Sequence, residues 1–408
     1  MIFLIAATMV IGIGLVVYQY NNFTPQRINV SISEKALAYY KDTWESNHLA
    51  FEALAKSLSK TYNAQVGEVK VESDLDSELS IDYCHIPSKK ASSRLLIISS
   101  GVHGIEGYVG SAVQRLFLNE VLPELNIDEM GILLIHGINA YGFKHNRRVS
   151  ENNVDLNRNC STKPALYNHR NKGYEALNKW LNPSEPVNPK SLRNVFFILN
   201  AVSKIATNGM STLRQAVLQG QYQFENSIYF GGKTLDGPIK AITPLIQKTA
   251  NSYDSVFCID LHTGYGERGV LHLFPNPMEE GQRKDQIKSI FQDYPIDWGD
   301  GDDFYTVTGD FVTYVGAVIP EKHYLTMTFE FGTLDSQTTF GAITSLHRVI
   351  LENQGFHHGF DSENSELSIK SQFVEGYYPS SKTWRTKAIE DAKILLKTSI
   401  PKYAKLLL

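Results

Sequence analysis

The chain has 408 residues, of which 42% are hydrophobic and 20% are charged, a composition typical of a globular protein with ample core material. This length suits one large α/β domain or two ordinary domains. The formal net charge of −4 and the lack of a stretch dense in Lys and Arg argue against nucleic acid as the main partner.

The first predicted element covers residues 1–20. The stretch from Met1 to Tyr18 contains no charged side chain, and the first one in the chain is Arg27. About 20 apolar residues in a helix span the ~30 Å hydrocarbon core of a bilayer. A cleaved signal peptide would need a basic start and a small-x-small site, and neither is present. We therefore predict an uncleaved, single-pass membrane anchor. A cleaved signal peptide, and hence a secreted or periplasmic protein, is the alternative.

The remaining residues, 28–408, are predicted to form a single domain. Apolar residues at helical spacing predict one or two amphipathic helices over 33–61. Alternating or continuous apolar stretches predict strands at 69–71, 79–83, 95–100, 132–137, 255–261, 270–274 and 324–329. Further helices are predicted at 277–293 and 383–398, together with a helical insertion over about 161–250. Apolar strands that alternate with helices are typical of a sheet covered on both faces. We therefore predict a three-layer α/β/α fold with a mostly parallel, mixed central sheet.

Polar side chains follow three of these predicted strands. His103 and Glu106 leave the end of one strand, Asn157 and Arg158 lie on a loop after the next, and His262 ends a third. Ligands of such sheets bind beyond the carboxyl ends of the strands. Two histidines and one glutamate are the set that holds a catalytic zinc while leaving one position open for water. The sequence therefore predicts a metal site formed by His103, Glu106 and His262.

Two aspartates are candidates for supporting the predicted metal ligands. Asp260 lies two residues before His262, so on a strand the two side chains share a face or rim. Ligating histidines usually bond a carboxylate through their outer nitrogen. Either Asp260 or Asp155 could supply that contact.

The stretch 147–159 and one later acid complete the set of candidate site residues. Three arginines with interleaved asparagines suit the binding of a carboxylate or a developing oxyanion, because the guanidinium fork grips such groups at two points. Arg147 and Arg148 are adjacent, and spacing alone does not choose between them. Glu330 ends an apolar strand, where an acid is usually a cap or an ion-pair partner unless a metal site lies beside it.

Taken in order, these motifs resemble those of the zinc carboxypeptidases of the carboxypeptidase A superfamily, from about residue 95 to 332. The His-x-x-Glu pair matches at His103 and Glu106, the third ligand at His262, and the substrate-binding Asn-Arg motif at residues 157–158. The segment 139–143 is similar to the family's Asn-Pro-x-Gly turn, with alanine in place of proline.

The resemblance continues downstream. The segment 305–309 is similar to the one that carries the family's mobile active-site tyrosine, at Tyr305, and Glu330 occupies the place of the general base. The segments 220–222 and 229–232 look like a signature of a bacterial branch whose substrates are undefined.

The resemblance implies zinc as the cofactor and a role for each candidate residue. It implies that Glu330 is the general base and acid, and that Arg148, with Arg147 as the close alternative, is the oxyanion donor. It also implies that Asn157 and Arg158 bind the substrate carboxylate and that Tyr305 closes over the bound substrate.

Three functions stay open for this catalytic domain. The first is a zinc carboxypeptidase that acts on peptides, and the second is an aspartoacylase-like deacylase of N-acyl amino acids. Both imply a substrate with a free carboxylate. The third is a non-catalytic, membrane-tethered binding protein, which would be expected to lack a ligand or the glutamate, and none is missing. A serine hydrolase is disfavoured because the chain has no Gly-x-Ser-x-Gly elbow.

Overall fold

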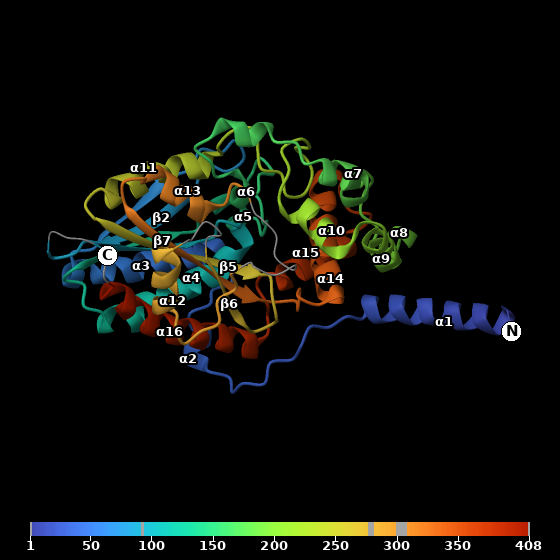
Figure 1. Ribbon diagram of the computed structural model, residues 1–408, viewed down its shortest axis with the longest axis horizontal. Coiled ribbons are helices and arrows are strands. Elements are labelled where there is room, and N and C mark those ends of the chain that lie inside the picture. Colours follow the sequence, from blue (N-terminus) through green and yellow to red (C-terminus); the bar gives the residue numbers. More distant parts are fainter. Residues whose placement is uncertain (1, 91–93, 276–280, 299–307, 407–408) are drawn as a thin grey trace.

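A seven-stranded sheet forms the centre of the computed structural model, which describes residues 2–90, 94–275, 281–298 and 308–406 (Figure 1). The strand order is β1-β2-β4-β3-β5-β7-β6. The strands are β1 (Gln65–Lys70), β2 (Ser80–Ile86), β3 (Arg94–Ser100), β4 (Met130–His136), β5 (Ser255–Gly264), β6 (Leu271–Phe274) and β7 (His323–Gly332).

The four central strands run parallel. β3 pairs with β4 on one side and with β5 on the other, and β5 pairs with β7, all in parallel. The remaining strands pair antiparallel at the two edges: β2 with β4, β1 with β2, and β6 with β7. Every strand predicted from apolar patterning is present, with its ends shifted by a few residues.

Two helical layers cover the sheet, because successive side chains of a strand point to opposite faces. On β3, Leu96 and Ile98 join one core, whereas Leu95 and Ile97 join the other. The first core is covered by α3 (Trp44–Tyr62), α4 (Gly107–Leu116), α12 (Gln282–Ile290) and α16 (Lys382–Ala404). The second is covered by α11 (Gly237–Ala250) and α13 (Phe311–Val318) (Figure 1). The predicted three-layer α/β/α fold with a mixed sheet is therefore confirmed.

The segment 161–250 contains several helices in two positions. α7 (Lys172–Leu181), α8 (Leu192–Val195), α9 (Phe197–Asn208) and α10 (Met210–Leu218) gather at one end of the molecule beside α14 (Thr339–His358) (Figure 1). Only α11, at the end of the segment, packs on the sheet. The shorter or later helices are α2 (Glu34–Leu37), α5 (Ala140–Lys144), α6 (Leu156–Asn159) and α15 (Glu363–Glu375).

The prediction for the N-terminal residues is corrected by the structure. In the described part of the chain, no helix combines the length and the apolar character needed to cross a membrane. The predicted membrane anchor at residues 1–20 and the localisation based on that anchor are therefore wrong, and the membrane as a partner has no support.

The physical reason for this correction lies in the last turns of α1 (Ile2–Asn21), which pack on the rest of the protein. Val17 and Tyr20 are buried, and the Tyr20 hydroxyl lies 2.9 Å from Nδ1 of His347. The Asn21 amide donates to the carbonyl of Val195 over 3.0 Å. These turns therefore pack against α8 and α14.

Candidate active site

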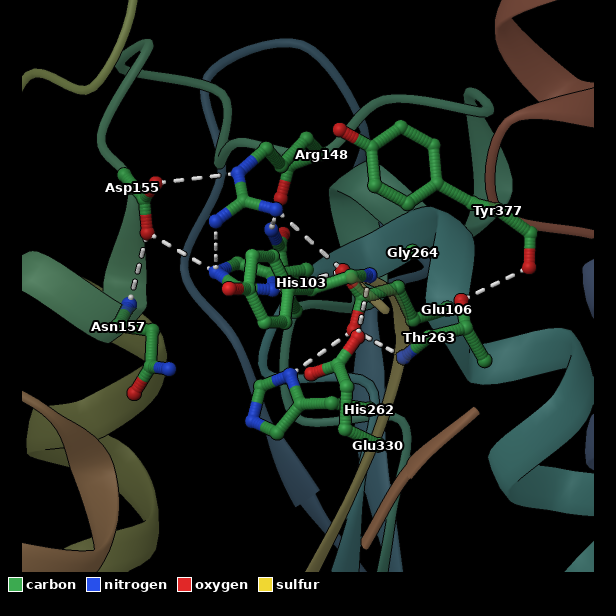
Figure 2. A network of polar contacts seen from close by, with 12 residues as sticks. His103, Glu106, Arg148, Asp155, Asn157, His262, Thr263, Gly264, Glu330 and Tyr377 are labelled. Atoms are coloured by element: carbon green, nitrogen blue, oxygen red, sulfur yellow. Dashed lines mark hydrogen bonds and ion pairs between the residues drawn. The ribbon is translucent and has the colours of Figure 1, made fainter. Parts of the chain in front are cut away.

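Three buried side chains, His103, Glu106 and His262, meet at the carboxyl ends of two neighbouring parallel strands (Figure 2). The first two follow β3, and the third lies on β5. Nδ1 of His103 is 2.8 Å from Oε1 of Glu106, and Nδ1 of His262 is 2.8 Å from Oε2 of the same carboxylate. One ligand atom from each residue lies within 4.8 Å of the others. We call these residues the His-Glu-His triad.

The loop that carries the first two triad residues is fixed by close backbone contacts. Gly101 has a φ of +71°, a conformation that glycine adopts without a steric penalty. A Cβ at Gly104 would lie 2.1 Å from the backbone of Gly142, so only glycine allows this approach to α5. The amides of Gly104 and Ile105 donate to the carbonyls at positions 148 and 147. The loop and the arginine stretch therefore form one rigid unit.

Each triad histidine has an aspartate at its outer nitrogen. Nε2 of His103 lies 3.1 Å from Asp155, and Nε2 of His262 lies 2.7 Å from Asp260. The hydroxyl of Ser99 donates to the other oxygen of Asp260 over 2.7 Å. A proton on Nε2 of His262, held by Asp260, leaves its Nδ1 directed at the centre of the triad, and Nδ1 of His103 points there as well. This is the outer arrangement that metal-ligating histidines usually have.

The protonation equilibria of the triad reflect this crowding of charge. Burial opposes ionisation, but the nearby His103 and His262 hold the pKa of Glu106 below its ordinary value. Burial would lower the pKa of His262, yet Asp260 and Glu106 raise it well above its ordinary value. Without a metal, these shifts favour a protonated His262 paired with an ionised Glu106. A divalent cation could replace that proton, because two imidazole nitrogens and one carboxylate oxygen form a donor set that suits zinc.

Glu330 lies beside the triad on β7, directly opposite His262 in the parallel register (Figure 2). One of its carboxylate oxygens accepts a hydrogen bond of 2.8 Å from the amide of Tyr265. Burial and the neighbouring charge of Glu106 raise the pKa of Glu330 to about 8. The site therefore contains a carboxyl group that can both accept and return a proton near neutral pH.

The two adjacent arginines have different positions. Arg148 points to the triad: Nε donates to Asp155 over 3.1 Å, Nη2 lies 2.7 Å from Nε2 of His103, and Nη1 lies 3.4 Å from Glu106 (Figure 2).

Arg147 points away from the triad. Nε donates to Glu352 on α14 over 2.8 Å, and the guanidinium lies 3.5 Å from the ring centre of Phe356. The choice between adjacent arginines, which the sequence left open, is thus resolved in position: only Arg148 faces the triad.

The predicted carboxylate binders lie on α6, next to α13. The side-chain oxygen of Asn157 accepts from the amide of Phe311 over 2.9 Å. Arg158 donates from Nε to the carbonyl of Leu218 over 2.7 Å and from Nη1 to that of Asn157 over 2.9 Å. The Tyr222 hydroxyl donates to the carbonyl of Arg158 over 2.6 Å. Tyr222, in the segment 220–222 noted in the sequence, therefore helps to position the backbone of Arg158.

A cavity of about 260 Å³ joins these groups, since the triad, Arg148, Asn157, Arg158, Asp260 and Glu330 all line it. Tyr305 lies outside the described residues. Tyr229, Tyr265 and Tyr377 line the cavity, and the ring centres of Tyr229 and Tyr377 lie 5.6 and 6.0 Å from the guanidinium carbon of Arg148. Tyr377 could not be found from the sequence because no motif surrounds it, whereas Tyr229 begins the segment 229–232.

The sequence of the chain matches one protein family. A family described as "Protein of unknown function (DUF2817)" matches residues 41–391, most of the chain. The chain belongs to this family. Among curated proteins, no significant match is found.

Several solved structures are similar to this family member. One is bovine thrombin-activatable fibrinolysis inhibitor, at 12% identity and a TM-score of 0.44, with 82% of this chain and 98% of that chain covered. Another is carboxypeptidase A from Helicoverpa armigera, at 12% identity and a TM-score of 0.45, with 92% and 82% covered. A third is murein-tripeptide amidase MpaA from Escherichia coli O157, at 15% identity and a TM-score of 0.34, with 70% and 91% covered. The expected resemblance to carboxypeptidases is thus found, as a distant one.

The outer aspartates allow a first prediction. Asp260→Asn would keep the size of the side chain but remove the charge that holds Nε2 of His262. We expect zinc affinity to fall by ~10–100-fold, the usual cost of losing such a partner. Competition with a chromogenic chelator measures this affinity. Asp254→Asn, an exposed position just before the same strand and away from the triad, is the control. An unchanged affinity in Asp260→Asn would contradict the role of this aspartate.

Proposed function

We propose that the chain is a zinc-dependent hydrolase of the carboxypeptidase type, which cleaves the amide bond preceding a residue with a free carboxylate. The removal of a C-terminal residue from a peptide is the simplest such reaction. The observation that carries the proposal is the convergence of two Nδ1 atoms and one carboxylate, each histidine with an aspartate at its outer nitrogen.

Each neighbouring side chain has a place in this reaction. When bound to the triad, zinc would lower the pKa of a water molecule towards ~7 and polarise the substrate carbonyl. Glu330 accepts the proton of the attacking water and returns it to the leaving nitrogen. Arg148 stabilises the negative charge that develops on the carbonyl oxygen. Asn157 and Arg158 hold the free carboxylate, which restricts cleavage to the end of a chain.

Arg148→Ala is expected to lower kcat by ~10²–10³-fold, the usual effect of removing an oxyanion donor. KM should change less, because the developing charge exists only in the transition state. Steady-state kinetics with a blocked dipeptide measure both constants.

Arg147→Ala is the matched control for Arg148→Ala. It leaves Glu352 without its ion pair, so it should lower the melting temperature while the folded fraction keeps its kcat. A large loss of kcat in the folded Arg147 variant, with little in Arg148→Ala, would reverse the two assignments.

The pH dependence of the wild-type enzyme follows from Glu330. A general base must be ionised, so kcat/KM should rise with pH through the pKa of this residue. Burial and Glu106 raise that pKa from 4.5 to about 8 without a metal, and a bound cation would lower it. We therefore expect a midpoint between 4.5 and 8 in a pH profile of kcat/KM. A profile in which kcat/KM rises as the pH falls through this range would contradict the assignment.

A direct test uses the full chain and a peptide library. Release of C-terminal amino acids should stop after treatment with a chelator and return on addition of zinc. Activity that survives both chelation and Glu330→Gln would refute the proposal. The same residues would serve an N-acyl amino acid equally well, because its hydrolysis also breaks an amide next to a carboxylate.

A further inference from the structure

A cavity of about 490 Å³ lies apart from the active site, between the segment that joins α1 to α2 and the first turn of α16 (Figure 1). Among the described residues, none lines both this cavity and the active-site cavity. The charged side chains that line it, within the same part of the chain, are three arginines and one carboxylate. We call it the arginine cavity, defined by Arg27, Arg268, Arg348 and Glu375. Its lining therefore carries a surplus of two positive charges.

Two of these arginines are partly buried and lack a contacting counter-charge. Nη1 of Arg268 donates to the carbonyl of Thr333 over 2.6 Å, and Nη1 of Arg348 donates to that of Gln372 over 2.8 Å. Neither guanidinium forms an ion pair with a described residue, and Nε of Arg348 is buried with no hydrogen-bond partner among those residues. Burial lowers the pKa of both arginines, and the charge of Arg268 also lowers the pKa of Arg348. An anion in the cavity would offset both effects.

The third arginine, Arg27, is exposed, but the backbone on both sides of it is held in place. The amide of Gln26 donates to the carboxylate of Asp335 over 2.6 Å. The side chain of Ile28 occupies the space that a Cβ at Gly269 would need. The guanidinium of Arg27 itself has no ion pair or hydrogen bond with a described residue, so it can bind a ligand without giving up a contact.

The first turn of α16 adds neutral donors to the cavity. Ser380, Ser381 and Thr383 line it, and each carries a hydroxyl. The N-terminus of a helix favours anions, because its first N–H groups have no partner within the helix. The carboxylate of Glu375 accepts a hydrogen bond of 2.9 Å from the amide of Ser380, so its own charge is partly compensated by the backbone.

We propose that the arginine cavity binds a phosphate group, either as inorganic phosphate or as the phosphate monoester of a small molecule. A phosphate monoester carries a charge of about −1.5 to −2 at pH 7, which matches the surplus of positive charge. Guanidinium groups and hydroxyls surround the cavity, and the terminal oxygens of a phosphate accept more hydrogen bonds than the two oxygens of a carboxylate. This site does not depend on the proposed function.

Isothermal titration calorimetry of the full chain with inorganic phosphate, glycerol phosphate and succinate tests the proposal. We expect saturable binding of the phosphates, and weaker binding of succinate, whose two negative charges lie on separate carboxylates. Tighter binding of glycerol phosphate than of inorganic phosphate would assign the site to a monoester, and the reverse order to free phosphate. Either order supports a phosphate site, whereas succinate that binds more tightly than both would overturn it.

Two variants remove charge from the cavity, and one control does so elsewhere. Arg27→Glu and Arg348→Gln should each weaken phosphate binding by ~10–100-fold, the usual cost of losing a hydrogen bond to a charged group. The melting temperature checks folding, and Arg27→Glu is expected to fold because its side chain is exposed. Arg283→Glu, exposed on α12 and outside both cavities, is the matched control and should bind phosphate as wild type does.

The variants also distinguish this cavity from the active site, whose arginines could hold phosphate as well. Phosphate bound at the triad would survive Arg27→Glu, because Arg27 does not line that cavity. The absence of saturable phosphate binding, or binding that Arg27→Glu leaves unchanged, would overturn the proposal. An equal loss in Arg283→Glu would also overturn it, because the effect would then come from net charge. If Arg348→Gln does not fold, Arg27→Glu decides alone.

Discussion

Glu330→Gln is expected to lower kcat by ~10²–10⁴-fold while the protein keeps one zinc ion per chain. The amide has the shape of the carboxylate but cannot accept the proton of the attacking water. The residue is not one of the three candidate ligands, so metal binding should survive. Because the folded protein raises the pKa of Glu330, ionisation at neutral pH costs stability, and the metal-free variant should melt at or above the wild-type temperature.

Three readouts check this variant: kcat on the substrate that wild type cleaves best, bound zinc by elemental analysis, and the melting temperature without metal. Glu321→Gln, an exposed substitution just before the same strand, is the control and should match wild type. If Glu330→Gln retained more than a tenth of the wild-type kcat, the general base would have to be another group.

The second large effect concerns the metal itself. His262→Ala removes one of three candidate ligands, so zinc affinity should fall by more than the ~10–100-fold that loss of an outer partner costs. It also leaves the buried Asp260 and Glu106 without their imidazole, which should destabilise the metal-free protein by ~3–5 kcal/mol. Activity should be lost along with the metal.

Dialysis against a zinc buffer followed by elemental analysis measures this loss, and thermal unfolding measures the destabilisation. His358→Ala, at the exposed C-terminal end of α14, is the matched histidine control and should bind zinc as wild type does. A His262→Ala protein that retains one zinc ion of wild-type affinity would place the metal elsewhere.

The position of the triad could be predicted from the sequence because strand ends are strongly constrained. Apolar runs define β3 and β5, and parallel strands bring their carboxyl ends to one edge of a sheet. His103 and Glu106 follow the run that forms β3, and His262 lies near the end of the run that forms β5. These three residues therefore lie close together regardless of the loop conformations. Glu330 also lies at this edge, on β7, the strand next to β5.

Contacts between distant segments could not be predicted in this way. Arg147 and Arg148 differ only in which neighbour they meet, and the neighbour of Arg147 is Glu352, 205 positions away. Tyr377 follows α15 and reaches the cavity only through the packing of the C-terminal helices. An apolar run such as the one at residues 1–20 has the same pattern whether its helix spans a membrane or packs on the protein, as Val17 and Tyr20 do here.

The chemistry proposed here depends on one ion held by Nδ1 of His103, Nδ1 of His262 and the carboxylate of Glu106. Anomalous X-ray diffraction at the zinc edge, from crystals of the full chain grown with zinc, tests this most directly. We expect a single peak ~2.0–2.2 Å from each of these three atoms, with both Nε2 atoms still held by their aspartates. A peak at the Nε2 atoms or at other residues, or no peak at the triad, would contradict the account.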